Sequence, residues 1–151
     1  MSTGARLKIL LDTTYLLPIM GIQVKGIDDA LRALSRVKRR FRAEFYYTQY
    51  NIVEILGKLS RLDYDENIVA QGLRIINNEF VMTEPTVDGY IKALRLKHKG
   101  FNDLIDPLLY TTAVTRNLKF LTRDRYLIQF LTHEGEPIDN ILFEEDFLRS
   151  V

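Results

Sequence analysis

Four carboxylates stand at the borders of apolar segments in this chain, and acids placed in this way can hold a metal ion. They are Asp12, Glu54, Asp106 and Asp124. Each borders a segment that we expect to be buried, and burying a charge is costly unless the charge is paired or bound to a metal. If the fold gathers the four acids at one end of a sheet, they would form a site for a hard divalent cation.

Each of these acids also has a structural explanation, which the residues alone leave open. Asp12 begins the run Asp-Thr-Thr and could cap the helical turn that follows it, as aspartate often does. Asp124 could likewise end a strand and cap the next helix. Glu54 lies in a strongly apolar helix, but its helical phase also allows a position in solvent. Individually these signals are weak, and their common setting beside apolar segments makes them stronger together.

The third acidic position has two candidates. Asp106 precedes Pro107, and a residue before proline is pushed away from helical dihedral angles. Asp106 could therefore be the N-cap of a helix with Pro107 at its first position. If the helix begins earlier, Asp103 and Asp106 share one face of its first turn. In both cases the helix amino end stabilises anions, so both acids are candidate metal ligands.

The elements that must position these acids alternate between short apolar strands and amphipathic helices. We expect strands at 7–12, 44–48, 80–82, 118–122 and 140–143. We expect helices at 27–40, 50–62, 65–78, from about 84–86 to 99, from about 103–107 to 117, and at 126–131, with a helical turn within 13–20. This alternation predicts a three-layer α/β/α fold around a mostly parallel sheet of about five strands. Ligands bind outside the carboxyl ends of such strands, where Asp12 and Asp124 are expected.

Length and composition limit the number of domains, the chemistry of the site and the location of the protein. The 151 residues suit one domain with a real core, spanning 1–151. The absence of cysteine excludes disulfides, thiolate nucleophiles and cysteine zinc sites, and it fits a cytoplasmic protein. No apolar stretch approaches the roughly 20 residues that a membrane span requires, so we expect no membrane association.

Charge is nearly balanced, with 21 Lys and Arg against 20 Asp and Glu, so net charge alone does not indicate a nucleic-acid-binding protein. Its distribution is more informative, because one basic cluster could bind phosphates through counterion release. A solvated helix end, where cations favour the negative pole of the dipole, explains the cluster equally simply. The candidate phosphate contacts are Arg36, Lys38, Arg39 and Arg40, with Arg123 beside Asp124 as a separate candidate.

Four segments of the chain match a known family in order, spacing and local hydrophobicity. They are 9–17 (ILLDTTYLL), 50–56 (YNIVEIL), 106–113 (DPLLYTTA) and 118–124 (LKFLTRD). The last is the most specific, because it is a hydrophobic strand that ends in Thr-x-Asp. From about residue 7 to 143 the chain resembles the PIN-domain ribonucleases, including their VapC-like members.

This resemblance implies a role for each matching residue. Asp12, Glu54, Asp106 and Asp124 match the family's acidic quartet. By resemblance, Asp12, Asp106 and Asp124 are direct or water-mediated ligands of Mg²⁺ or Mn²⁺, and Glu54 orients water or a second metal ion. Two hydroxyl positions that typically hold metal-bound water or phosphate correspond to Thr14 and Thr122. Pro107 departs from the small, unbranched residue usual after the third acid, which leaves Asp103 as an alternative or additional ligand.

The function implied by the resemblance is metal-dependent endonucleolytic cleavage of RNA. Many single-domain relatives are toxins that a small antitoxin inhibits, whereas others process RNA, and the sequence does not separate these roles. A catalytically idle scaffold or RNA-binding module with the same fold is the alternative, and Pro107 favours it. A phosphatase-like enzyme with Asp12 as nucleophile is disfavoured because Thr14 replaces the expected second aspartate. A homodimer is expected, since dimers are the commonest assembly.

Overall fold

The computed structural model describes residues 6–151, which form a sheet of five parallel strands in the order β3-β2-β1-β4-β5. The strands are β1 (Lys8–Leu11), β2 (Glu44–Thr48), β3 (Val81–Thr83), β4 (Lys119–Thr122) and β5 (Ile141–Phe143). Every neighbouring pair is parallel, as the alternation of strands and helices predicts. The expected α/β fold around a parallel sheet is therefore confirmed.

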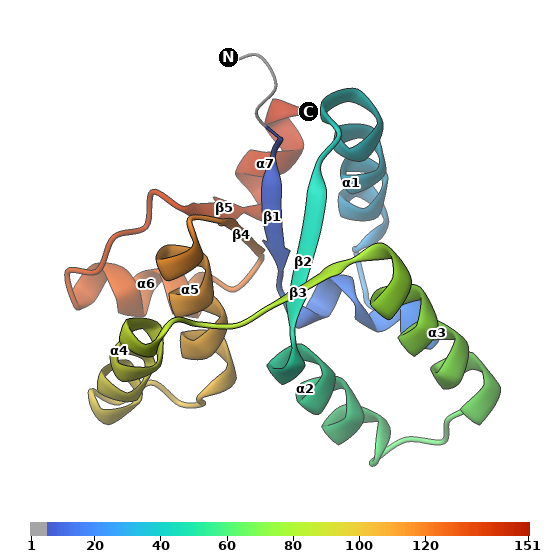
Figure 1. Cartoon of the computed structure of the whole chain (residues 1–151), viewed down its shortest axis with the longest axis horizontal. Helices are drawn as coiled ribbons and strands as arrows, with labels where there is room; N and C mark the ends of the chain where they lie inside the picture. Colours follow the sequence, from blue (N-terminus) through green and yellow to red (C-terminus); the bar gives the residue numbers. More distant parts are fainter. Residues whose placement is uncertain (1–5) are drawn as a thin grey trace.

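Helices cover both faces of this sheet (Figure 1). In the described chain they are the short 3-10 helices η1 (Thr13–Tyr15) and η2 (Leu17–Met20), and the α-helices α1 (Asp28–Phe41), α2 (Gln49–Leu59), α3 (Glu66–Glu79), α4 (Val87–His98), α5 (Ile105–Arg116), α6 (Arg125–His133) and α7 (Glu144–Ser150). In Figure 1, α4, α5 and α6 lie on one side of the strands, and α1 and α3 lie on the other. The molecule thus has the three layers expected of an α/β/α fold.

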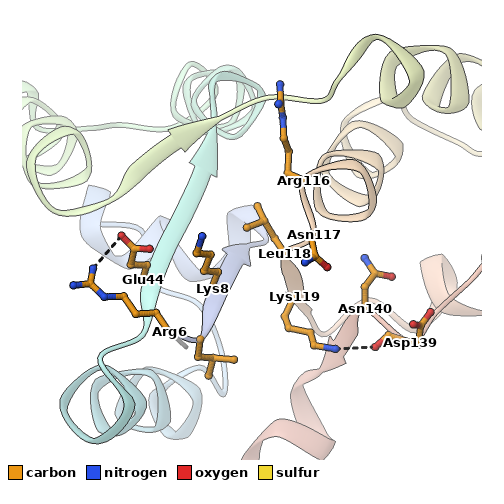
Figure 2. A pocket seen from close by; sticks show the side chains of 10 residues that line it. Arg6, Lys8, Glu44, Arg116, Asn117, Leu118, Lys119, Asp139 and Asn140 are labelled. Atoms are coloured by element: carbon orange, nitrogen blue, oxygen red, sulfur yellow. Dashed lines mark hydrogen bonds and ion pairs between the residues drawn. The ribbon is translucent and has the colours of Figure 1, made fainter. Parts of the chain in front are cut away.

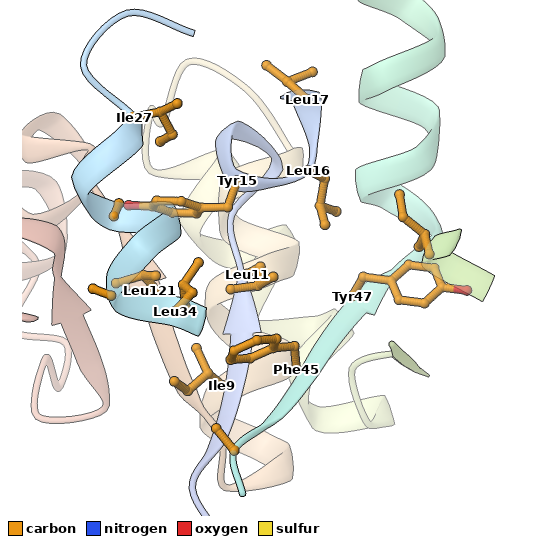
Figure 3. Close-up of a cluster of buried hydrophobic side chains, with 14 of the residues drawn as sticks. Ile9, Leu11, Tyr15, Leu16, Leu17, Ile27, Leu34, Phe45, Tyr47 and Leu121 are labelled. Carbon is orange, nitrogen blue, oxygen red and sulfur yellow. The ribbon is translucent and has the colours of Figure 1, made fainter. Parts of the chain in front are cut away.

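The hydrophobic core is divided between the two faces because side chains along a strand point alternately to opposite sides. In β1, Ile9 and Leu11 belong to the cluster under α1, and Figure 3 shows them beside Phe45 of β2. Leu10 points the other way, into the cluster under α5 and α6. All three are buried, as expected for a parallel sheet covered on both faces.

The strand order reverses direction beside β1. The chain moves from β1 through β2 to β3 on one side and then places β4 and β5 on the other side of β1. The carboxyl ends of β1 and β4 therefore form the switch point at which α/β sheets bind ligands. The backbone N–H of Asp12 donates to the Leu121 carbonyl at 3.1 Å and joins the two strand ends there.

One helix was not anticipated. The helix α7 follows β5 directly, and only Phe147 of its seven residues is buried. One buried residue gives no apolar periodicity to recognise. Its first turn carries Glu144, Glu145 and Asp146, which the positive helix amino end favours. Within residues 6–151, no helix is long and apolar enough to cross a bilayer.

Candidate metal centre

The four predicted acids line one pocket of about 260 Å³ at the carboxyl ends of β1 and β4. They arrive from four separate places: the end of β1, the second turn of α2, the first turn of α5 and the residue before α6. We call this the acidic pocket. Its lining consists of Asp12, Thr13, Thr14, Leu17, Glu54, Lys58, Asp106, Arg123 and Asp124.

Asp12 is a structural cap and a member of the pocket at once. Its Oδ1 accepts from the Thr13 backbone N–H at 2.8 Å, and its Oδ2 accepts from the Thr122 hydroxyl at 2.7 Å. Burial raises the pKa of Asp12 to about 6, the two hydrogen bonds oppose the shift, and the charges of Glu54 and Asp124 add to it. The capping role considered from sequence is therefore present, and the same side chain also lines the pocket.

Thr122 links the strand end to both aspartates. It is fully buried, so its hydroxyl cannot reach solvent. That hydroxyl donates to Asp12 and accepts from the Asp124 backbone N–H at 3.1 Å. The Asp124 side chain in turn caps α6, because its Oδ1 accepts from the N–H groups of Tyr126 and Leu127 at 3.0 and 3.3 Å. One chain of hydrogen bonds thus fixes the relative positions of Asp12 and Asp124.

Of the two arrangements considered for Asp106, the one that makes it an N-cap is wrong. The helix α5 begins at Ile105, so Asp106 is its second residue and Pro107 its third. A proline is tolerated there because the first four helix N–H groups lack intrahelical partners. Asp103 supplies the capping acid instead, since its Oδ1 accepts from the Asp106 N–H at 2.9 Å. Asp103 is also outside the lining of the acidic pocket.

Asp106 is the most perturbed acid of the pocket. Burial raises its pKa to about 9, and the charges of Asp12 and Asp103 add to the shift. A hydrogen bond with the Asp124 side chain raises the pKa further, because it favours the protonated form. At neutral pH Asp106 therefore keeps its proton, as expected where several carboxylates crowd together.

Glu54 and Thr14 complete the predicted set. Glu54 lies one turn before Lys58 on the same face of α2, so both side chains face the pocket. Thr14 is half-buried in η1 and lines the pocket as well. Asp12, Glu54, Asp106, Asp124, Thr14 and Thr122 are therefore brought together by the fold.

Asn51 is a residue of this region that sequence reasoning missed. Its Oδ1 accepts from the Thr48 N–H and hydroxyl at 2.7 and 3.0 Å, and its Nδ2 donates to the Leu11 carbonyl and the Thr13 hydroxyl at 3.2 and 3.0 Å. It is completely buried and ties the start of α2 to the end of β1. The signal was present in Thr48-x-x-Asn51, an Asn variant of the capping box.

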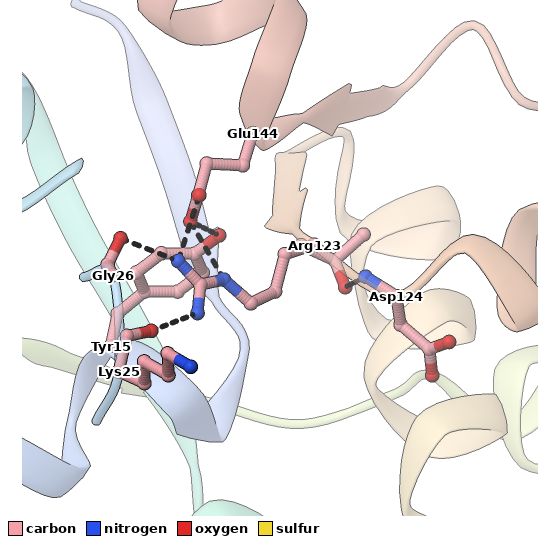
Figure 4. Close-up of polar contacts among 7 residues, drawn as sticks. Tyr15, Lys25, Gly26, Arg123, Asp124 and Glu144 are labelled. Atoms are coloured by element: carbon pink, nitrogen blue, oxygen red, sulfur yellow. Dashed lines mark hydrogen bonds and ion pairs between the residues drawn. The ribbon is translucent and has the colours of Figure 1, made fainter. Parts of the chain in front are cut away.

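Arg123 is partly buried and held by several hydrogen bonds (Figure 4). Its guanidinium donates twice to Glu144, from Nε at 3.1 Å and Nη2 at 2.9 Å, and to the carbonyls of Lys25 and Gly26 at 3.0 and 2.9 Å. Tyr15 also donates to Glu144, at 2.8 Å. Because burial and Glu144 favour its neutral form, the pKa of Tyr15 is raised. The guanidinium that was a candidate phosphate contact therefore anchors α7 to the strand end.

Comparison with families of known proteins gives a match that includes all four acids of this pocket. Residues 9–130 match the model of the PIN domain. The chain belongs to the PIN-domain family. Three solved structures share the fold of this PIN domain. They are VapBC2 from Rickettsia felis bound to a fragment of promoter DNA, a toxin-antitoxin complex from Klebsiella pneumoniae, and FitAcB from Neisseria gonorrhoeae.

The structural likeness covers most of the chains compared. The Rickettsia structure has a TM-score of 0.62 at 15% identity and covers 91% of this chain and 97% of its own. The Klebsiella complex has a TM-score of 0.59 at 16% identity and covers 90% and 97%. FitAcB has a TM-score of 0.54 at 15% identity and covers 82% and 93%. No curated protein sequence matches this PIN domain.

The carboxyl and hydroxyl groups of the acidic pocket are ligands that suit a divalent cation, although the acids do not stand in ligating positions. Within residues 6–151, no three His, Cys, Asp or Glu side chains stand close enough together to hold a metal ion. The carboxyl oxygens hydrogen-bond to Thr122, to helix N–H groups and to one another. A hard cation prefers oxygen ligands, and its charge would offset the burial and the neighbouring carboxylates that raise the pKa values of Asp12 and Asp106.

The predicted basic cluster lies elsewhere in this PIN domain. Arg36, Lys38, Arg39 and Arg40 occupy the second half of α1, which leads through Ala43 to the first residue of β2. Figure 1 shows this end of α1 beside the start of β2, at the edge of the sheet where strands begin. The acidic pocket lies at the opposite edge, where β1 and β4 end. The fold therefore does not bring these four cations to the acids.

Proposed function

We propose that this PIN domain, comprising the whole chain, is a metal-dependent endoribonuclease that hydrolyses RNA phosphodiesters with Mg²⁺ or Mn²⁺. The observation that supports this most directly is the convergence of four acids from four separate segments on one pocket at the switch point of the sheet. Carboxylates crowded so closely are unfavourable by themselves, as the raised pKa values of Asp12 and Asp106 indicate.

We assign the ligand role to Asp12, Asp106 and Asp124, with Asp103 stabilising the first turn of α5. When bound, the metal would lower the pKa of a water and neutralise charge on the phosphate oxygens. Glu54 orients the attacking water, and its neighbour Lys58 can attract the substrate phosphate. Thr14 positions water or phosphate, whereas Thr122 orients Asp12 through their 2.7 Å hydrogen bond.

RNA cleavage by paired variants tests this function. Purified protein with Mn²⁺ should cut single-stranded RNA, and Asp12→Asn should cut it at least about 100-fold more slowly, because the substitution removes a metal ligand. Glu145→Gln, an exposed acid on α7 outside the pocket, serves as the control and should retain full activity. Equal cleavage by wild type and Asp12→Asn would contradict the assignment.

Protein partners belong to the same proposal. Two of the solved structures are described as a toxin-antitoxin complex and as VapBC2 on promoter DNA, which supports a small antitoxin-like inhibitor and a cytoplasmic site of action. Exposed apolar side chains on α4, including Val87, Ile91 and Leu94, are available for a homodimer. Light scattering that returns only a monomer would contradict the dimer.

An idle scaffold is the competing function, and the protonated Asp106 hydrogen-bonded to Asp124 favours it. The melting temperature distinguishes the two, because a ligand that binds only the folded state raises stability by mass action. A nuclease should melt at higher temperature in millimolar Mn²⁺, and Asp12→Asn should lose this shift. A melting temperature that is independent of Mn²⁺ would favour the scaffold.

A further inference from the structure

A second and larger pocket, of about 770 Å³, opens at the edge of the sheet where the strands begin (Figure 2). We call it the basic pocket. It extends across the starts of β1, β2 and β4 and the segment that leads into β5. Its lining consists of Arg6, Leu7, Lys8, Glu44, Arg116, Asn117, Leu118, Lys119, Asp139 and Asn140.

Cations outnumber acids in this pocket by four to two. Arg6 forms an ion pair with Glu44 at 3.5 Å. Lys119 donates to the backbone carbonyl of Asp139 at 3.2 Å, and Arg116 donates to that of Glu84 at 2.9 Å, so neither charge is neutralised by its partner. Within residues 6–151, no salt bridge joins Lys8, Arg116 or Lys119 to a carboxylate.

Asn140 provides an independent indication of a ligand. Its side-chain Nδ2 and Oδ1 are both buried and have no hydrogen-bond partner among the described residues. Such groups are costly to leave unmatched, and native proteins contain few of them. The backbone of Asn140 is nevertheless fixed, because its carbonyl accepts from Phe120 of β4 at 2.9 Å. The amide is therefore held within the lining of a cationic pocket, with an N–H donor still to be satisfied.

A structural explanation exists for each cation taken singly. Arg116 lies in the last turn of α5, where the helix dipole favours a positive charge. Lys8 and Lys119 begin strands at an exposed edge. These explanations account neither for the convergence of four segments on one hollow nor for the unmatched amide of Asn140. An oxyanion in this hollow would be attracted by the cations that lack a salt bridge, and the Asn140 amide is an unmatched N–H donor in the same lining.

We propose that the basic pocket binds a phosphate group, supplied by a free nucleotide or by the backbone of RNA. The proposal does not depend on the nuclease function, because the acidic pocket lies at the opposite edge of the sheet. A phosphate in the basic pocket would leave the acidic pocket accessible, so both pockets can be filled in one molecule.

Titration with inorganic phosphate at constant ionic strength, followed by amide NMR, tests the proposal. We expect saturable shifts of the Asn140 side-chain NH₂ and of the Lys8 and Lys119 backbone amides. The double variant Lys8→Met/Lys119→Met should weaken binding at least tenfold, and Asn140→Ala should weaken it less. Arg39→Met/Arg40→Met removes the same charge from α1, outside the pocket, and should bind like wild type.

Two results would overturn the proposal: shifts that do not saturate, or equal losses in the Lys8/Lys119 and Arg39/Arg40 variants, which would indicate general charge screening. Asp12→Asn should bind phosphate normally, so failure of the nuclease function would leave this result intact. AMP and a single-stranded 20-mer RNA, both in EDTA, identify the source of the phosphate. Loss of RNA affinity in Lys8→Met/Lys119→Met assigns the pocket to the RNA backbone, whereas loss of AMP affinity alone assigns it to free nucleotides.

Discussion

The two edges of the sheet have opposite charge. At the carboxyl edge, four acids and two cations line the acidic pocket, and at the amino edge four cations and two acids line the basic pocket. The strand β1 spans the distance between them, since Lys8 begins it and Asp12 follows its end. The net charge of +1 thus hides a strongly uneven distribution, and clefts of one sign concentrate ions of the other.

The edges also differ in how completely their polar groups are satisfied. At the carboxyl edge, Asn51 makes four hydrogen bonds, and Arg123 bonds to Glu144 and to two carbonyls. At the amino edge, Asn140 makes no side-chain hydrogen bond within the described chain. The carboxyl edge is therefore rigidly built around carboxyl groups that repel one another, whereas the amino edge retains unused hydrogen-bonding capacity.

The largest expected difference in stability is between these two asparagines. Asn51→Ala should lower the free energy of unfolding by about 2–3 kcal/mol, because it leaves the buried Thr48 N–H and Leu11 carbonyl without partners. Asn140→Ala breaks no side-chain hydrogen bond and should change that free energy by less than about 0.5 kcal/mol. Urea denaturation of both variants measures the contrast. Equal destabilisation would mean that Asn140 has a structural partner in solution.

The sequence predicted the acids better than it predicted their supports. Asp12 and Asp124 were found because short apolar strands ending in aspartate can be recognised locally. Asn51 was missed although its capping motif was visible, because its contacts with β1 depend on packing between distant segments. The bond from Arg123 to Glu144 was not predictable, since α7 carries no apolar period and the partners are 21 residues apart.

The sequence also left the third acid open. The proline after Asp106 suggested that Asp106 is the N-cap of the helix. In the structure α5 begins at Ile105, Asp103 accepts from the Asp106 N–H, and Asp106 lines the pocket. Helix boundaries shift by one or two residues without a strong local signal. The basic cluster of α1 was equally visible in sequence, but only the fold could show that it lies at the amino edge.

A smaller difference is expected between two ion pairs that anchor α7. Arg123–Glu144 is partly buried, with 13% of the Glu144 side chain exposed, whereas 49% of the Glu145 side chain is exposed in Arg125–Glu145. Glu144→Gln should cost about 1–2 kcal/mol of stability, because it weakens the contacts of a partly buried guanidinium. Glu145→Gln should cost less than about 0.5 kcal/mol. Thermal unfolding compares the two, and equal losses would show that Arg123 is not a special anchor.

The last expected effect tests the cost of burying acids together at the carboxyl edge, through pH. The pKa values of Asp12 and Asp106 are raised from 3.8 to about 6 and about 9. Above about pH 4 the unfolded chain therefore releases protons that the folded chain keeps, so stability without metal should fall as pH rises. Asp106→Asn removes the more strongly shifted group, so it should make the fall of the unfolding free energy with pH shallower, by about 1 kcal/mol per pH unit.

Metal should reverse this pH dependence, because cation binding displaces the protons and becomes tighter as pH rises. Melting curves from pH 5 to 8, with EDTA and with Mn²⁺, measure both slopes. Lys8→Met at the amino edge is the matched control and should leave the slope in EDTA unchanged, because it lies outside the acidic pocket. If Asp106→Asn melts like wild type at every pH, the pKa of Asp106 is not raised by burial and neighbouring charges, and the carboxyl edge is not destabilised by its acids.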